Sequence, residues 1–164
     1  MMQEDLEERA EGFTGAIHAT SVAIGGQAVL LRGESGSGKS DLALRMIDRG
    51  GLLISDDYTQ IHRSGDDVIA VSAANIGGQI EVRGVGIVTL PFLARAPVGL
   101  VVMLTGKDGR EPERMPPEGR TVRLCGVDLP CLELTARHAS TPLKIELALR
   151  ERCGIIFPAG AAWT

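Results

Sequence analysis

The stretch GESGSGKS, residues 33–40, decides how this chain folds. It matches the pattern G-x-x-x-x-G-K-S at every fixed position. The apolar run before it, residues 28–32, predicts a strand, and the residues from Lys39 onward have the apolar spacing of a helix. A strand before and a helix after are the context that this pattern requires. A glycine-rich turn that matches by chance is therefore the weaker interpretation.

Such a loop surrounds an anion, because its glycines let backbone N–H groups turn inward. The positive end of the following helix points to the same place. We therefore predict that the loop binds the phosphates of a nucleoside triphosphate. The expected binding residues are Gly33, Glu34, Ser35, Gly36, Ser37, Gly38, Lys39 and Ser40. Lys39 would contact the β and γ phosphates, and the Ser40 hydroxyl would bind Mg²⁺.

The composition narrows the class of protein. The chain has 164 residues, 44% of them hydrophobic, and a net charge of −4, which fits one globular domain without the basic surface of a nucleic-acid-binding protein. Its three cysteines lack a C-x-x-C spacing, which argues against a disulfide framework or a zinc site. The start is acidic, unlike a secretory signal, and the longest apolar run, residues 98–104, is too short to cross a bilayer.

We accordingly expect a cytoplasmic protein with no nucleic-acid or membrane partner. Residues 1–14 read as an acidic, poorly ordered lead-in, and residues 15–164 as a single domain. Strands are expected at residues 17–24, 28–32, 52–55 and 98–104. A further hairpin is expected with its two strands flanking residues 64–67, and another within residues 121–134. A second helix is expected at residues 142–152. So many hairpins predict an α/β domain with a mixed sheet.

Two adjacent acids follow the strand expected at residues 52–55. Asp56 and Asp57 come seventeen and eighteen residues after Lys39, where a metal-directing carboxylate is expected beside a phosphate loop. One could direct Mg²⁺, and the other could accept a proton from an incoming hydroxyl. The alternative is an exposed Asp-Asp turn that opens the next hairpin.

Glu81 and His18 are weaker candidates when judged by position alone. Glu81 could complete a magnesium site, and Gly84 and Gly86 nearby would let another backbone or a substrate approach closely. A glutamate on a strand nevertheless usually faces solvent. A single histidine such as His18 is more often structural than catalytic.

Taken together, these segments resemble the C-terminal kinase domain of the HPr kinase/phosphorylase family. The matching pieces are, in chain order, AIHATSVAI, GESGSGKS, RGGLLISDD and IEVRGVGIVTL. The last resembles the signature stretch of the family and is far more specific than the phosphate loop. The resemblance implies a fold similar to phosphoenolpyruvate carboxykinase, with a mixed sheet around the phosphate loop. It also implies transfer of phosphate from ATP to a serine of the phosphocarrier HPr of the sugar phosphotransferase system.

The resemblance also implies roles for individual residues. Lys39 would hold ATP, and Ser40 and Glu81 look like Mg²⁺ ligands. Asp57 looks like the base that receives the serine proton. Asp56 would support the metal or the base. His18 would lie near these aspartates.

A catalytic arginine is also implied. It follows the strand at residues 98–104 in the family, and Arg114 is its best match here, with Arg110 as the second choice.

Some questions stay open at this level. The family's segment tied to phosphate removal has no clean match in ARHASTPLKIELAL, so the resemblance does not predict that reverse activity. A homo-oligomer is possible but not implied. Two alternatives to the HPr kinase remain: a nucleotide-binding regulatory module that docks to a partner such as a sensor kinase, and a small-molecule kinase.

Overall fold

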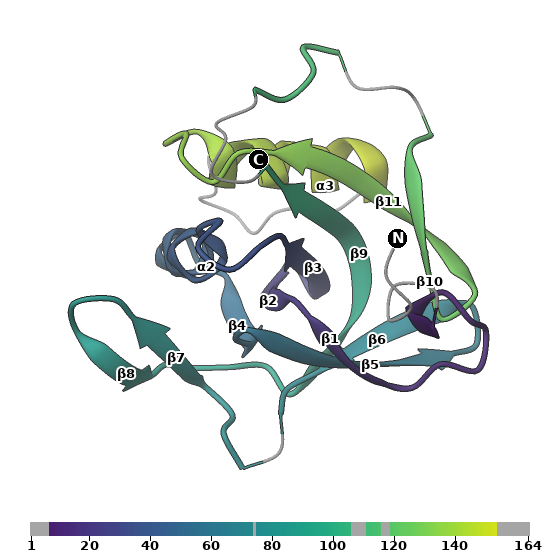
Figure 1. Ribbon diagram of the computed structural model, residues 1–164, viewed down its shortest axis with the longest axis horizontal. Helices are drawn as coiled ribbons and strands as arrows, with labels where there is room; N and C mark the ends of the chain where they lie inside the picture. The colour runs from purple at the N-terminus through teal and green to yellow at the C-terminus, as the bar shows by residue number, and fades with distance from the viewer. Residues whose placement is uncertain (1–6, 74, 106–110, 116–118, 154–164) are drawn as a thin grey trace.

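A computed structural model of the chain describes residues 7–73, 75–105, 111–115 and 119–153. Two helices and two sheets make up these regions (Figure 1). The elements are β1 (Gly15–His18), β2 (Thr20–Ile24), β3 (Gln27–Arg32), α2 (Lys39–Asp48), β4 (Leu52–Ser55), β5 (Tyr58–Ser64), β6 (Asp67–Val71), β7 (Gln79–Val82), β8 (Gly86–Thr89), β9 (Arg95–Leu104), β10 (Thr121–Leu124), β11 (Val127–Leu134) and α3 (Thr141–Cys153).

The main sheet is mixed, as the hairpins predicted. Its order is β1-β5-β6-β9-β3-β2-β4, with β11 beside β9 and β10 beside β11. The pairs β3–β9 and β9–β11 are parallel, and the other pairs are antiparallel. The strands β3, β9 and β11 therefore end at one edge of the sheet. This edge carries the phosphate loop, and strand ends of this kind are where α/β proteins bind ligands.

One detail of the strand prediction was wrong. The single strand expected at residues 17–24 is divided at Ala19, because β1 pairs with β5 whereas β2 pairs with β3 and β4. The stretch interrupted by Gly84 and Gly86 forms the separate hairpin β7–β8, which projects from the main sheet (Figure 1).

The two glycines serve that turn, not a close approach of another backbone. Gly84 has a φ of 88° and Gly86 a φ of 113°, and a Cβ at either would meet nothing within 4 Å. Their positive φ values are what favours glycine here.

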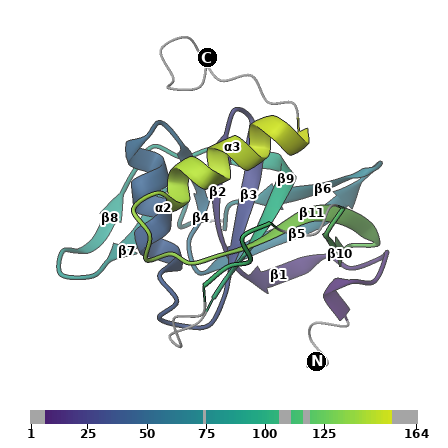
Figure 2. The same cartoon turned by 90° about the horizontal axis from the view of Figure 1, so that it is seen from above.

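Two apolar cores lie on opposite faces of the strand that leads to the phosphate loop. Successive β3 side chains alternate between them, so Leu31 joins one core and Leu30 the other. The first core packs under α2 and α3, which lie together on one face of the sheet (Figure 2). The second is shared with β1, β5 and β6. Because β3 is buried on both faces, its position is fixed, and so is the position of the phosphate loop that follows it.

Part of the acidic lead-in contacts the domain. The Glu8 side chain accepts two hydrogen bonds from Arg32, at 2.8 and 3.1 Å, and its backbone oxygen accepts one from the Cys125 amide. The domain boundary expected at residue 14 stays a prediction, but the described residues before it pack against β3 and the β10–β11 turn. Within the described regions, no helix is both long and apolar enough to span a bilayer.

Candidate active site

The phosphate loop lies between β3 and α2. Gly36 and Gly38 have φ values of 81° and 95°, in the left-handed region that only glycine enters without strain. A Cβ at Gly38 would also lie 2.9 Å from the Cβ of Ala136. Alternation of these glycines with ordinary residues curls the backbone so that its N–H groups can face an anion. The helix dipole of α2 begins at the same point.

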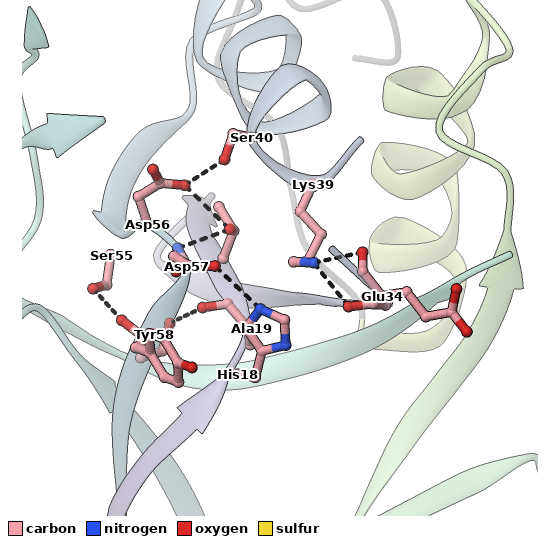
Figure 3. A network of polar contacts seen from close by, with 12 residues as sticks. His18, Ala19, Glu34, Lys39, Ser40, Ser55, Asp56, Asp57 and Tyr58 are labelled. Carbon is pink, nitrogen blue, oxygen red and sulfur yellow. Dashed lines mark hydrogen bonds and ion pairs between the residues drawn. The ribbon is translucent and has the colours of Figure 1, made fainter. Parts of the chain in front are cut away.

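Lys39, the first residue of α2, turns back over the loop. Its Nζ donates to the backbone oxygens of Gly33 and Glu34, at 2.8 and 3.0 Å (Figure 3). Only 6% of Lys39 is exposed. Burial lowers the pKa of its ammonium group, and the carboxylates of Asp57 and Asp56 oppose that shift. The lysine side chain is thus buried, and backbone oxygens of the phosphate loop hold it in place.

Asp56, just past the end of β4, faces the loop. Its Oδ1 accepts hydrogen bonds from the hydroxyls of Ser40, at 2.7 Å, and Thr20, at 3.2 Å. Its Oδ2 accepts one from the backbone N–H of Glu81, at 3.3 Å. Strand β4 runs in the same direction as β3, since both are antiparallel to β2. The Asp56 carboxylate therefore lies at the same edge of the sheet as the phosphate loop.

Asp57 has an unusual backbone. Its φ is 66°, and the Tyr58 amide donates to the Asp56 oxygen across it, at 2.7 Å. An i to i+2 hydrogen bond around a residue with positive φ makes a tight γ-turn of the rare, strained kind. The turn aims the two neighbouring carboxylates differently. Asp57 Oδ1 accepts a hydrogen bond from His18 Nε2, at 3.1 Å (Figure 3).

Thr20 is one of the residues at this site that sequence reasoning missed. It is fully buried, and its hydroxyl donates to Asp56 Oδ1 while accepting the Asp57 N–H at 3.0 Å. One side chain thus fixes both acids. The sequence offered one signal for it. Thr20 comes two residues after His18, so a second polar residue lies close to the candidate histidine.

A cleft of about 530 Å³ contains most of the predicted site. Its walls include Ser35, Gly36, Gly38, Lys39, Ser40, Asp41, Asp56, Asp57, Glu81 and Arg83. The phosphate loop and both acids therefore share one cavity. The exposed turn at Asp56-Asp57, considered as the alternative interpretation, does not describe Asp56, which three hydrogen bonds hold toward the loop.

The donor set fits Mg²⁺ bound together with phosphate. Within the described regions no three acidic, histidine or cysteine side chains gather as metal ligands. Mg²⁺ needs no such cluster, because it usually takes one or two carboxylates with phosphate oxygens and water. The Ser40 hydroxyl and the Asp56 carboxylate, 2.7 Å apart, offer such ligands, with Glu81 on the same cleft wall.

The predicted catalytic arginine is not brought to this cleft. Arg114 is exposed and is absent from the residues that line the cleft, whereas Arg83 of the β7–β8 turn is among them. Arg110, the second choice, lies outside the described residues. The degenerate sequence around Arg114 gave no periodic pattern from which its direction could be predicted.

The family model described as the HPr Serine kinase C-terminal domain matches residues 12–151. Similar curated proteins include an HPr kinase/phosphorylase of Caldicellulosiruptor bescii, 33% identical over 73% of this chain and 42% of the relative. Another is an HPr kinase/phosphorylase of Chlorobium phaeobacteroides, 36% identical over 71% of this chain and 39% of the relative. This chain therefore matches about two fifths of the length of those relatives.

A solved structure agrees with the sequence matches. The Hpr(Ser) kinase/phosphatase from Coxiella burnetii superposes with a TM-score of 0.72 at 26% identity, covering 83% of this chain and 94% of that one. The overall fold described above is thus shared with a protein of that name. Both the extent of the family match and this shared fold show that the chain belongs to the HPr Serine kinase C-terminal domain family.

Proposed function

We propose that this protein is an ATP-dependent serine kinase that transfers the γ-phosphate to a serine of an HPr-type phosphocarrier, in the cytoplasm. The observation that carries the proposal is the shared cleft. An anion-binding loop and two acids line it, and the second acid is open to solvent, with 62% of its side chain exposed. A protein hydroxyl can therefore reach Asp57, which a buried acid would not allow.

In the proposed reaction, Asp57 orients the serine hydroxyl and takes its proton. The serine oxygen forms a bond to the γ-phosphorus while the bond to the β–γ bridging oxygen breaks, which leaves ADP and phosphoserine. The contact between His18 Nε2 and Asp57 Oδ1, 3.1 Å, supports a role for His18 in orienting this carboxylate. Positioning of this kind supplies much of the rate in phosphoryl transfer.

In this proposal the phosphate loop and the metal ligands stabilise the negative charge of the ATP phosphates. Lys39 would leave the loop carbonyls and bind the β and γ phosphate oxygens, and the loop amides would hold the rest of the chain of phosphates. Ser40, Asp56 and Glu81 would hold Mg²⁺, which when bound neutralises charge on the phosphate oxygens. The catalytic role of Arg114 stays a prediction that rests on the resemblance. Arg83 is the arginine whose position on the cleft wall supports the same role.

The test is incubation of the purified full chain with Mg²⁺, labelled ATP and purified HPr. Label on an HPr serine is the expected result. Nucleotide binding without transfer would instead favour the regulatory module that docks to a partner. Lys39→Ala should weaken ATP binding and transfer together, and retention of both would contradict the phosphate-loop assignment.

The Asp57→Asn variant tests the proposed base within the same assay. The amide cannot accept the serine proton, so we expect transfer to fall by about a hundredfold or more while ATP affinity is kept. ATP affinity measured by calorimetry is the control, since Asp57 is not assigned to nucleotide binding. Unchanged turnover would remove Asp57 from the role of base.

A further inference from the structure

An exposed aromatic side chain lies next to the proposed base. Tyr58 follows Asp57 directly and is the single tyrosine of the sequence. It is the first residue of β5, a strand of the main sheet, yet its exposed fraction is 56%. Asp57 lines the cleft of the candidate active site, whereas Tyr58 does not. Tyr58 therefore lies beside the base but outside the cleft.

The sheet directs the Tyr58 side chain to solvent. In the β1–β5 pair Tyr58 lies opposite His18, and residues directly opposite each other share one face of a sheet. Ile17, the neighbour of His18, belongs to the second apolar core and so marks the other face. The next pair on the face of Tyr58 is Ala16 and Gln60, and both are exposed. These two pairs form an outer strip that starts beside Asp57.

Tyr58 is held firmly in its place. The centroids of its ring and the His18 ring are 5.3 Å apart, and the planes are tilted by 37°, which is an ordinary aromatic contact. His18 in turn contacts Asp57 Oδ1 (Figure 3). The Tyr58 amide donates to the Asp56 oxygen, and the Tyr58 oxygen accepts from the Ser55 hydroxyl. The backbone thus presents an exposed ring in a fixed position.

A protein that brings a hydroxyl to Asp57 comes close to this ring. The Asp57 amide is bonded inward, to the buried Thr20 hydroxyl. Its neighbour Asp56 faces the phosphate loop, where the nucleotide is proposed to bind. Its own Oδ1 contacts His18, which packs on Tyr58. Because consecutive Cα atoms of a chain are about 3.8 Å apart, residues next to the acceptor serine come within reach of the ring.

We infer that Tyr58 binds the acceptor protein directly, through packing of its ring on an apolar side chain next to the phosphorylated serine. The inference rests on the proposed function. A tyrosine ring suits this role because it offers a large, rigid apolar surface, and tyrosines are frequent among the residues that carry the affinity of protein interfaces. The ring is exposed in the free protein and becomes buried when the acceptor binds.

Kinetics with HPr as the acceptor test this contact. Tyr58→Ala removes the ring, and Tyr58→Phe keeps it. We expect Tyr58→Ala to raise KM for HPr about tenfold and to change kcat at saturating HPr by less than about threefold. ATP affinity, measured by calorimetry with Mg²⁺, should be kept because Tyr58 lies outside the cleft. Tyr58→Phe should have the KM of the unaltered chain.

Leu52→Ala is the matched control. Leu52 is also an exposed apolar side chain of the main sheet, but it begins β4, whereas Asp56 follows the end of that strand. This variant should leave KM for HPr unchanged. An equal rise of KM in Leu52→Ala and Tyr58→Ala would overturn the contact. A fall in kcat of Tyr58→Ala at an unchanged KM would also overturn it, because Tyr58 would then act only through His18.

The single tyrosine also allows a direct measurement. The full chain prepared with fluorotyrosine carries one fluorine reporter, at Tyr58. We expect its fluorine NMR signal to shift when unlabelled HPr is added with Mg²⁺ and a non-hydrolysable ATP analogue. A signal that stays in place while calorimetry shows HPr binding would overturn the contact.

The proposed function and the Tyr58 contact fail in different ways. Absence of transfer to HPr by the unaltered chain would overturn the proposed function, and the contact with it. Normal transfer by the unaltered chain together with an unchanged KM in Tyr58→Ala would overturn the contact alone.

Discussion

At the scale of single residues, the site depends on how two neighbouring acids are made to differ. Asp56 accepts three hydrogen bonds and faces the loop, whereas Asp57 sits at the centre of a strained turn and reaches solvent. An aspartate tolerates a positive φ better than most residues, which explains why the turn can form without glycine. Backbone strain of this kind persists only where the surrounding contacts enforce it.

Thr20 contacts both sides of this turn, through the Asp57 amide and the Asp56 carboxylate, which leads to a prediction. Thr20→Val removes the donor to Asp56 and the acceptor for the Asp57 amide without changing the side-chain shape. We expect a loss of about 1–3 kcal/mol in the free energy of unfolding. Phosphate transfer should also fall about tenfold to a hundredfold, because Asp57 loses its position. Denaturant unfolding and the HPr assay measure the two effects.

Thr59→Val is the matched control. Thr59 is also fully buried, and its hydroxyl bonds to the Ala19 oxygen and the Ser21 hydroxyl, both at 2.8 Å, and not to either carboxylate. This variant should lose similar stability and keep its transfer rate per folded molecule. Equal losses of transfer in the two variants would mean that Thr20 matters only for stability.

At the scale of elements, helix α2 is defined by glycines at both ends. Gly38 precedes it with a φ of 95°, and Gly50 follows it with a φ of 104°. At the far end the amides of Gly50 and Gly51 donate to the oxygens of Ile47 and Met46, at 2.9 and 3.0 Å, which is the Schellman arrangement of hydrogen bonds. A glycine with positive φ thus ends the helix at its C-terminus, and another shapes the phosphate loop at its N-terminus.

Alanine at each of these two glycines should separate the two uses. Gly38→Ala adds a Cβ 2.9 Å from Ala136 and forces a positive φ, so the loop must shift. We expect ATP affinity to fall by about tenfold or more, together with a loss of stability. Gly50→Ala meets no atom within 4 Å and should cost only about 1 kcal/mol of stability. Calorimetry with ATP should show normal affinity for Gly50→Ala, and an equal loss in both variants would contradict this division.

At the scale of the whole molecule, the segment before the first strand is part of what supports the loop. Arg32, the residue just before Gly33, forms a two-pronged ion pair with Glu8, and the exposed fractions of the two side chains are 14% and 11%. Glu11 also forms an ion pair, with Arg63 at 3.4 Å, but 83% of its side chain is exposed. The two pairs therefore differ both in burial and in the number of contacts.

The difference in burial predicts a difference in stability. Glu8→Ala leaves a largely buried guanidinium without its carboxylate, and we expect it to lower the free energy of unfolding by about 3 kcal/mol. Glu11→Ala breaks an exposed pair and should cost at most about 1 kcal/mol. Urea titrations of both variants give the comparison. Similar midpoints would mean that the Glu8 contact adds nothing beyond a surface ion pair.

The sequence alone determined the local parts of this protein. The loop, the helix after it, the hairpin turns and the place of Asp56 and Asp57 after a strand were predictable, because glycine conformation, apolar periodicity and motif spacing act over a few residues. Tertiary structure alone decided that β1 and β2 separate at Ala19, that Thr20 joins the two acids, and that Arg83, not Arg114, lines the cleft. These outcomes depend on contacts between residues far apart in the chain. A local sequence pattern cannot predict which distant residues will be in contact.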